Sequence, residues 1–191
     1  MSLFQRPAKA LGLTLYQQQE RHRLILALLE VFGRTYPSIT YELIWESFSI
    51  NAQAWRLGAE RRVRVYGGLV RHPIMTKSGL ALMLAHETGH HLGGPPNDPA
   101  LPWLTWQGQA DFWAASVGMP TVWGSHARSM TLRGAQEILA LHRTFESTAD
   151  LDEEDISPEC RQEIFEAGAN GKRIPASAEE TYASMLREAC E

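Results

Sequence analysis

The chain has 191 residues, of which 44% are hydrophobic and 21% are charged, and its net charge is −4. This is the composition of an ordinary globular protein with enough length for one substantial core, so we expect a single domain over residues 1–191. The charge gives no reason to expect nucleic acid as a partner, no stretch reaches the roughly 18 apolar residues of a membrane span, and no signal peptide is visible at Met1. The location of the protein stays open, with the periplasm or another extracytoplasmic compartment among the choices.

The first elements predicted along the chain are one helix and two strands. Residues 14–34 are expected to form a helix, because apolar side chains recur there at positions i, i+3, i+4 and i+7. Residues 40–50 alternate loosely and are expected to form a strand with a bulge, whereas residues 62–66 alternate cleanly and predict a second strand. The second strand is either an ordinary member of the sheet or an edge that binds an extended peptide by backbone pairing. Gly67 and Gly68 then either make a turn or let substrate approach the backbone.

Five further helices are expected in the rest of the chain. They cover residues 80–92, 103–117, 129–144, 158–167 and 177–189. Thr76 or Ser78 can cap the first of these helices, and Gly93 marks its end. An acidic loop from about residue 147 precedes the last two helices and is expected to be solvated. This order of elements predicts an α+β fold, with a mainly helical body and a small β-sheet beside the helix over residues 80–92.

The strongest functional signal is the sequence His-Glu-Thr-Gly-His at residues 86–90. Two histidines four residues apart on a helix differ by about 40° in direction, so both imidazoles can reach one metal ion. This spacing is that of the zinc-protease motif His-Glu-x-x-His. In such a site, the glutamate removes a proton from the attacking water and passes it to the leaving amine. We therefore predict that His86 and His90 are zinc ligands and that Glu87 is the general base.

The alternative is an ordinary helix that carries two exposed histidines. The preceding run, residues 80–85, is almost wholly apolar, which predicts that this helix is buried nearly all round. Buried imidazoles need polar partners, and a metal ion supplies one. Gly89 inside the helix costs up to about 1 kcal/mol relative to alanine, and a closely packed neighbour would explain it. The context therefore favours the metal site.

A catalytic zinc site of this kind needs a third protein ligand. One motif places a histidine six residues after the second histidine, but Pro96 occupies that position and has no donor atom. Asp98 follows two prolines and is disfavoured, and the upstream cysteine of peptide deformylases has no counterpart here. The remaining pattern uses a following helix, and Gln107 and Asp111 share one face of the helix predicted there.

The two helices resemble those of the gluzincin metallopeptidases, such as thermolysin and the membrane-bound prenyl-protein and heat-shock proteases. Residues 67–73, 86–94, 108–114 and 158–161 also look like a group of uncharacterised bacterial metalloproteases, in which the second motif is Glu-Gly-Gln-Ala-Asp. The resemblance covers roughly residues 60–170. It implies a zincin-like fold, zinc as the cofactor, and peptides or proteins as substrates. It also implies that Gln107 is the third zinc ligand and that Asp111 orients His86 from behind.

This chain departs from the family pattern at Gln107, where the family has glutamate. An amide oxygen can coordinate zinc, but it is neutral and is a weaker ligand than a carboxylate. Three interpretations follow. Gln107 binds zinc in an active or weakened enzyme, Asp111 replaces it as the ligand, or the protein is a degenerate protease that binds peptides without cutting them.

Other residues have open roles at this point. His72, His91, His126 and His142 could stabilise a tetrahedral oxyanion, and His126, in a predicted loop, is the favoured candidate. Cys160 and Cys190 could be free thiols or one disulfide.

The predicted function is zinc-dependent hydrolysis of peptide bonds, with Glu87 as the base and His86, His90 and Gln107 as the ligands. The rivals are a zinc-containing module that binds peptides without turnover, and a zinc hydrolase that acts on another substrate.

Overall fold

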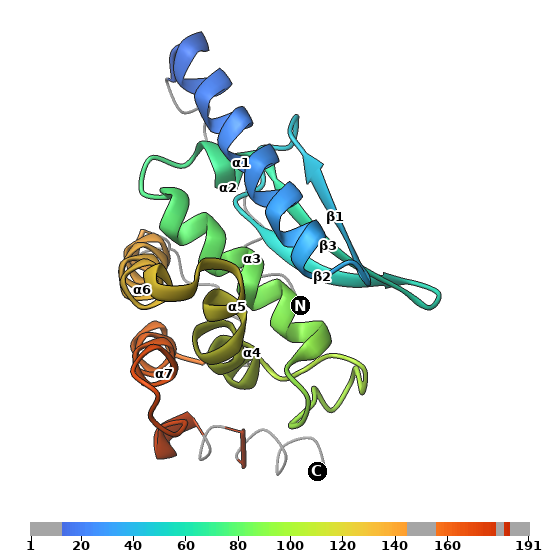
Figure 1. Ribbon diagram of the computed structural model, residues 1–191, viewed down its shortest axis with the longest axis vertical. Helices are drawn as coiled ribbons and strands as arrows, with labels where there is room; N and C mark the ends of the chain where they lie inside the picture. The colour runs from blue at the N-terminus through green and yellow to red at the C-terminus, as the bar shows by residue number, and fades with distance from the viewer. Residues whose placement is uncertain (1–12, 145–155, 179–181, 184–191) are drawn as a thin grey trace.

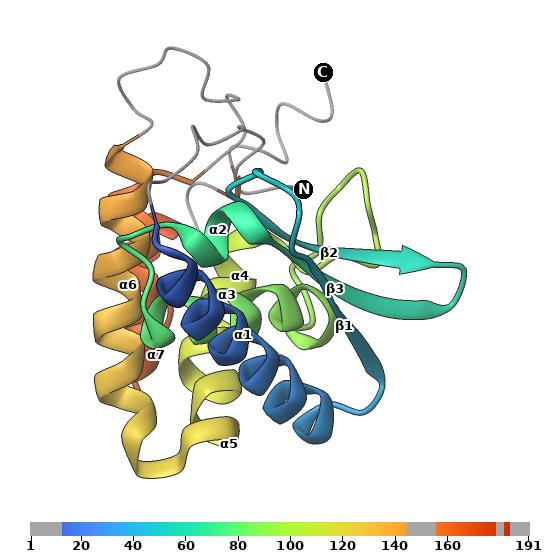
Figure 2. The ribbon, with the colours of Figure 1, turned by 90° about the horizontal axis from the view of Figure 1, so that it is seen from above.

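The computed structural model describes residues 13–144, 156–178 and 182–183 of the chain. Its helices and short helical turns are α1 (Leu15–Thr35), α2 (Gly67–Arg71), α3 (Lys77–Leu92), α4 (Gln107–Trp113), the π-helix η1 (Ala114–Gly118), α5 (Met119–Trp123), the 3-10 turn η2 (Gly124–His126), α6 (Ala127–Arg143) and α7 (Pro158–Ala169). A three-stranded sheet lies on one side of α3, and α6 and α7 lie on the other side (Figures 1 and 2). The predicted α+β fold, mainly helical with a small sheet beside the motif helix, is confirmed.

The sheet has the order β1-β3-β2, formed by Ile39–Ile44, Glu60–Tyr66 and Ala52–Leu57 respectively. β3 runs parallel to β1 and antiparallel to β2. The single strand predicted over residues 40–50 is wrong in extent, because β1 ends at Ile44 and a separate strand, β2, begins at Ala52. The prediction that residues 62–66 could be the free edge is also wrong, because β3 is the central strand and is paired on both sides. Among the described strands, β2 is the edge beside α3.

The first helix, α1, follows the sequence prediction closely. The Thr14 side chain accepts a hydrogen bond from the Gln17 backbone N–H, and the Gln17 side chain accepts one from the Thr14 backbone, so the helix starts in a capping box. The apolar stripe of α1 is buried at Ile25, Leu28 and Phe32, which belong to the main core. This burial holds α1 against the rest of the body.

Gly67 and Gly68 begin the short helix α2 and have a packing role. A Cβ atom on Gly67 would lie 1.9 Å from the Trp45 carbonyl oxygen, and one on Gly68 would lie 2.2 Å from the Phe48 carbonyl oxygen. The two glycines therefore let α2 approach the backbone of the β1–β2 connection. Because both glycines are helical, the predicted turn is wrong.

The motif helix α3 is held at its start by its own cap and by α6. The Thr76 hydroxyl accepts a hydrogen bond from the Ser78 backbone N–H, as predicted. The Glu137 carboxylate of α6 accepts from the backbone N–H groups of Thr76 and Gly79, at 2.8 and 3.0 Å. A carboxylate in this place satisfies orphan donors and complements the positive end of the helix dipole. Every residue of α3 from Ser78 to His91 is buried, which confirms the predicted burial.

The tryptophan-rich helix begins later and extends further than predicted. Residues 103–106 are not helical, because the backbone there pairs elsewhere: Thr105 N–H donates to the His90 carbonyl, and Trp106 N–H donates to the Pro96 carbonyl. The predicted end at residue 117 is also wrong. The chain continues as η1 and α5, and Pro120 occupies the first turn of α5, where its missing N–H costs nothing.

The C-terminal part is described only in pieces. α6 and α7 match the predicted helices to within two residues at each end. The acidic loop lies mostly within residues 145–155, outside the described residues, and so does most of the helix predicted over residues 177–189. No helix in the described part of the chain is long and apolar enough to cross a membrane.

Candidate metal centre

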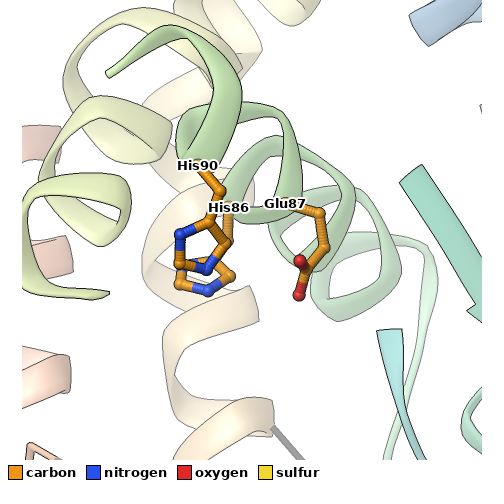
Figure 3. A group of neighbouring side chains, drawn as sticks. All are labelled: His86, Glu87 and His90. Carbon is orange, nitrogen blue, oxygen red and sulfur yellow. The ribbon is translucent and has the colours of Figure 1, made fainter. Parts of the chain in front are cut away.

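The three motif side chains come together on one side of α3. His86, Glu87 and His90 each offer a ligand atom, and these atoms all lie within 4.8 Å of one another. The two imidazole rings meet edge to face with their centroids 4.5 Å apart. Figure 3 shows the rings together and the Glu87 carboxylate beside them. All three side chains are at most 1% exposed, so the cluster is desolvated.

Each histidine is fixed through its Nδ1 atom by a partner outside α3. His86 Nδ1 lies 2.6 Å from Asp111 Oδ1 of α4, and His90 Nδ1 lies 2.7 Å from the Thr105 carbonyl oxygen. Because these partners are acceptors, Nδ1 carries the proton and donates in both rings. The lone pair of a neutral imidazole then lies on Nε2, which is the arrangement of metal-binding histidines held by an outer partner.

Five buried side-chain atoms of the motif and of α4 have no hydrogen-bond partner. They are His86 Nε2, His90 Nε2, both carboxylate oxygens of Glu87, and Gln107 Oε1, and all are buried. Buried polar atoms without a partner are costly, and most proteins satisfy nearly all of them. Two imidazole nitrogens, an amide oxygen and a carboxylate are a donor set that suits zinc. The residues present therefore fit a metal ion.

Gln107 and Asp111 lie on α4, one turn apart, and Asp111 contacts His86 of the cluster. Gln107 is the first residue of α4 and is 9% exposed. α4 can approach α3 closely because Gly89 has no side chain: a Cβ there would lie 2.8 Å from the Ala110 carbonyl oxygen. The closely packed neighbour predicted for Gly89 is therefore confirmed.

Asp111 is held by a residue to which the sequence assigned no role. The Arg161 guanidinium of α7 donates from Nε to Asp111 Oδ2 at 2.7 Å and from Nη2 to Oδ1 at 2.6 Å. This bidentate pair is buried, with Arg161 3% exposed and Asp111 fully buried. Together with His86, it occupies both oxygens of the Asp111 carboxylate. The signal for Arg161 was the segment at residues 158–161 that shares the family resemblance.

Burial and neighbouring charges set the protonation of these groups. Burial raises the pKa of Glu87, and the backbone N–H of Ala54 in β2 comes near the carboxylate without meeting hydrogen-bond geometry. Burial, followed by the nearby His86, holds the pKa of His90 well below its usual value, so its imidazole is neutral. Burial alone would raise the pKa of Asp111, but Arg161 and His86 outweigh it and lower the pKa to about 2. Asp111 is therefore a carboxylate that accepts from both of them.

The other histidines have separate surroundings. His126 is exposed in the turn before α6, and the structure does not bring it to the cluster. His72 lies just after α2. The His91 ring points to the sheet, where Nε2 donates to the Arg62 carbonyl at 2.9 Å. His142 is buried near the end of α6, within electrostatic range of Arg161 and His86.

The two cysteines lie in the C-terminal part of the chain. Cys160, at the start of α7, has a free thiol whose Sγ lies 3.7 Å from the Ser177 hydroxyl. Its possible disulfide partner, Cys190, lies outside the described residues, so their pairing stays an open question.

A buried His-Glu-x-x-His helix beside a small mixed sheet, with a second helix that supports the first histidine, defines a zincin-type metallopeptidase. Residues 16–151 match the model of peptidase family M48, and the chain belongs to that family. The match contains both histidines of the motif, Gln107 and Asp111, and it ends before Arg161. No curated protein and no solved structure matches the chain.

Proposed function

We propose that this protein is a zinc-dependent peptidase in which His86, His90 and Gln107 hold the metal and Glu87 is the general base. The observation that carries the proposal is the set of buried atoms without partners: two imidazole Nε2 atoms, the Gln107 amide oxygen and the Glu87 carboxylate. Membership of a metallopeptidase family supports the reaction class. The three ligands would leave a coordination position open for water or substrate, as in catalytic zinc sites.

The roles of the side chains follow from their positions. Zinc, when bound, supplies Lewis acidity that polarises the scissile carbonyl and makes water a better nucleophile. Glu87 removes a proton from the attacking water and delivers it to the nitrogen of the leaving amine. Its raised pKa suits both steps, because a base with a pKa closer to neutrality also returns the proton readily. Asp111 and the Thr105 carbonyl fix the two imidazoles, so the ligands need no reorganisation.

The identity of the third ligand rests on the contrast between Gln107 and Asp111. Both oxygens of Asp111 are occupied, by His86 and by the Arg161 guanidinium, whereas Gln107 Oε1 is buried without a partner. A rotation of Asp111 toward the metal would break a buried ion pair, which is strongly destabilising. This favours Gln107 as the ligand.

The neutral amide of Gln107 also supports a second candidate function. A site with two imidazoles and an amide binds zinc more weakly than one with a carboxylate, because the ligand that attracts the dication most strongly is lost. A peptidase weakened in this way could act as a zinc-containing module that binds peptides without turnover.

A digest of a mixed peptide library separates the two functions. The zinc-loaded wild type is expected to cleave peptides, and Glu87→Gln is expected to lower the cleavage rate at least about a hundredfold, because general base catalysis typically contributes that much. A wild type that binds zinc and peptides but cleaves none supports the binding module. Cleavage that is unchanged in Glu87→Gln contradicts the proposed mechanism.

Restoring the family residue, glutamate, at position 107 tests whether Gln107 weakens zinc binding and cleavage. If Gln107 limits the enzyme, Gln107→Glu is expected to bind zinc more tightly and to cleave faster than the wild type. Gln107→Asn is the matched control, since it keeps the neutral amide but shortens the reach of the oxygen. Equal zinc affinity in wild type and Gln107→Glu argues against Gln107 as a ligand.

A further inference from the structure

Two arginines face each other at the end of the sheet beside the second half of α3. Arg56 of β2 is directly opposite Arg61 of β3 in the antiparallel register. Like charges placed directly across from each other destabilise a sheet unless something compensates them. The adjacent arginines of β3 are compensated, since Arg62 and Arg64 both pair with Glu42. No ion pair among the described residues includes Arg56 or Arg61.

The guanidinium of Arg56 is held in place without being neutralised. It lies over the ring of Trp103, 4.8 Å from the centroid, and Trp103 in turn stacks on His91 with centroids 5.5 Å apart. The Nε atom of Arg56 is buried and has no hydrogen-bond partner. The neighbouring His91 supplies no negative charge, because an imidazole is either neutral or positive. The stack fixes a cation that has no ion-pair partner in the described part of the chain.

The arginine pair lies on the same face of the sheet as the reacting centre. The Ala54 side chain of β2 is buried where the strand contacts α3, the Ala54 backbone lies near the Glu87 carboxylate, and Arg56 is two residues further along the same strand. Residues i and i+2 of a strand point to the same face and are about 7 Å apart. No other strand in the described part of the chain pairs with the outer edge of β2, and such an edge can bind a peptide in extended form by backbone pairing. A peptide paired with β2 would pass Glu87 and then the arginines.

We infer that Arg56 and Arg61 form a subsite for a carboxylate of the substrate, placed about two residues from the bond that is cut. This inference rests on the proposed peptidase function and adds the chemical class of the substrate to it. Two guanidinium groups can bind a carboxylate through several charge-assisted hydrogen bonds. The carboxylate belongs either to an acidic side chain or to the C-terminus of the peptide. Its binding would neutralise the facing charges of Arg56 and Arg61.

Binding of matched peptides tests the inference without depending on turnover. The probes are fluorescein-labelled decapeptides of alanine and serine with two central glutamates or two central glutamines, each with a free or an amidated C-terminus. Full-length, zinc-supplied Glu87→Gln protein is titrated with them, and fluorescence anisotropy gives the dissociation constants. The peptides with a carboxylate are expected to bind about tenfold tighter than the neutral amidated peptide, as several charge-assisted hydrogen bonds would give. If amidation of the C-terminus removes the tighter binding, the subsite binds a C-terminal carboxylate. If replacement of the glutamates by glutamines removes it, the subsite binds an acidic side chain.

The variants are made in the same background. Arg56→Gln and Arg61→Gln are each expected to lose most of the tenfold preference and to bind the neutral peptide within about twofold of the parent. Arg56→Lys, which keeps the charge, is expected to keep part of the preference. Arg23→Gln removes an equal charge from the exposed side of α1 and is expected to keep the whole preference for peptides with a carboxylate.

The outcomes separate this inference from the proposed function. Equal affinity for all four peptides overturns the subsite, and so does a preference that survives in both Arg56→Gln and Arg61→Gln. If wild-type protein cleaves peptides with no preference for a carboxylate, the subsite alone fails. If the preference is present and depends on the arginines but the wild type cleaves nothing, the subsite stands and the peptidase function fails.

Discussion

Arg161 stabilises the buried negative charge of Asp111, although it is far from the motif in the sequence. Asp111 is fully buried and keeps its charge because Arg161 and His86 both contact it. Removing one partner of a buried ion pair leaves an uncompensated charge, which costs far more than the pair gains over an apolar substitute. The orientation of His86 therefore depends on a residue of α7.

Replacing Arg161 with methionine is expected to lower the free energy of unfolding by about 3–5 kcal/mol, because Asp111 would be left buried with one partner. Urea unfolding of the metal-free protein measures this change. Arg128→Met is the control, since Arg128 is exposed and bonds only to the Asn170 side chain among the described residues. It is expected to change stability by less than about 0.5 kcal/mol. A loss below about 1 kcal/mol for Arg161→Met would contradict the role given to this pair.

The sequence could predict part of this site. The spacing of His86, Glu87 and His90 was sufficient to bring them together, because four residues make one turn of any helix. The family resemblance includes Arg161, but its contact with Asp111 could not be predicted, since the two residues lie 50 positions apart in the chain and meet only through the packing of α7 on α4. The facing position of Arg56 and Arg61 could not be predicted either, because only the register of β2 with β3 places them opposite each other.

At the scale of elements, the contact between α3 and α4 decides whether Gln107, the proposed third ligand, can reach the motif. Gly89 allows this contact, since its missing side chain leaves room for the Ala110 backbone and the Trp113 ring. In an ordinary helix, glycine is less favourable than alanine by about 1 kcal/mol, so the residue is retained against its helix propensity. Close packing of the two helices outweighs that cost.

Substituting alanine at two helical glycines is expected to give opposite signs. Gly89→Ala should destabilise the protein by about 1–3 kcal/mol, because the new Cβ would lie 2.8 Å from a backbone oxygen that cannot move freely. Gly33→Ala in α1 should stabilise it by up to about 1 kcal/mol, because its new Cβ would meet only Tyr41 at 3.9 Å. Thermal unfolding compares the two variants with the wild type. A stabilised Gly89→Ala would show that α4 does not pack as described.

The elements that sequence predicted best were those with local signals. α1 and α3 combine an apolar pattern with a side-chain cap, and both begin within three residues of the expected position. β2 was missed because its inward side chains, Ala52 and Ala54, are small and give little alternation. α2 was missed because two glycines usually mark a turn, whereas here they allow a helix to contact the β1–β2 connection.

At the scale of the whole molecule, buried neutral histidines make stability depend on pH. Burial, with a smaller effect from Arg161, lowers the pKa of His142 to about 3, whereas an unfolded histidine titrates near 6.5. Between these two values the unfolded chain binds a proton that the folded chain does not. Stability therefore falls as pH decreases from about 6.5 toward 3, by up to about 1.4 kcal/mol per pH unit for one histidine.

Removing the His142 imidazole is expected to flatten this dependence. His142→Leu should lose less stability than the wild type between pH 6.5 and pH 4.5, as measured by urea unfolding in the presence of a chelator. His126→Leu should follow the wild-type curve, because His126 is exposed and its imidazole is not desolvated on folding. Parallel curves for wild type and His142→Leu would show that His142 takes up its proton in the folded protein.

The measurement that tests the central claim most directly is the zinc affinity of the wild type and of Gln107→Ala, determined by competition with a chromophoric chelator. We predict one zinc ion per chain in the wild type, and at least about a tenfold weaker affinity in Gln107→Ala, because one of three protein ligands is lost. Gln109→Ala is the matched control, since the Gln109 side chain donates to the Gly93 carbonyl and lies about 200° around α4 from Gln107. Equal zinc affinity in wild type and Gln107→Ala would contradict a site built from His86, His90 and Gln107.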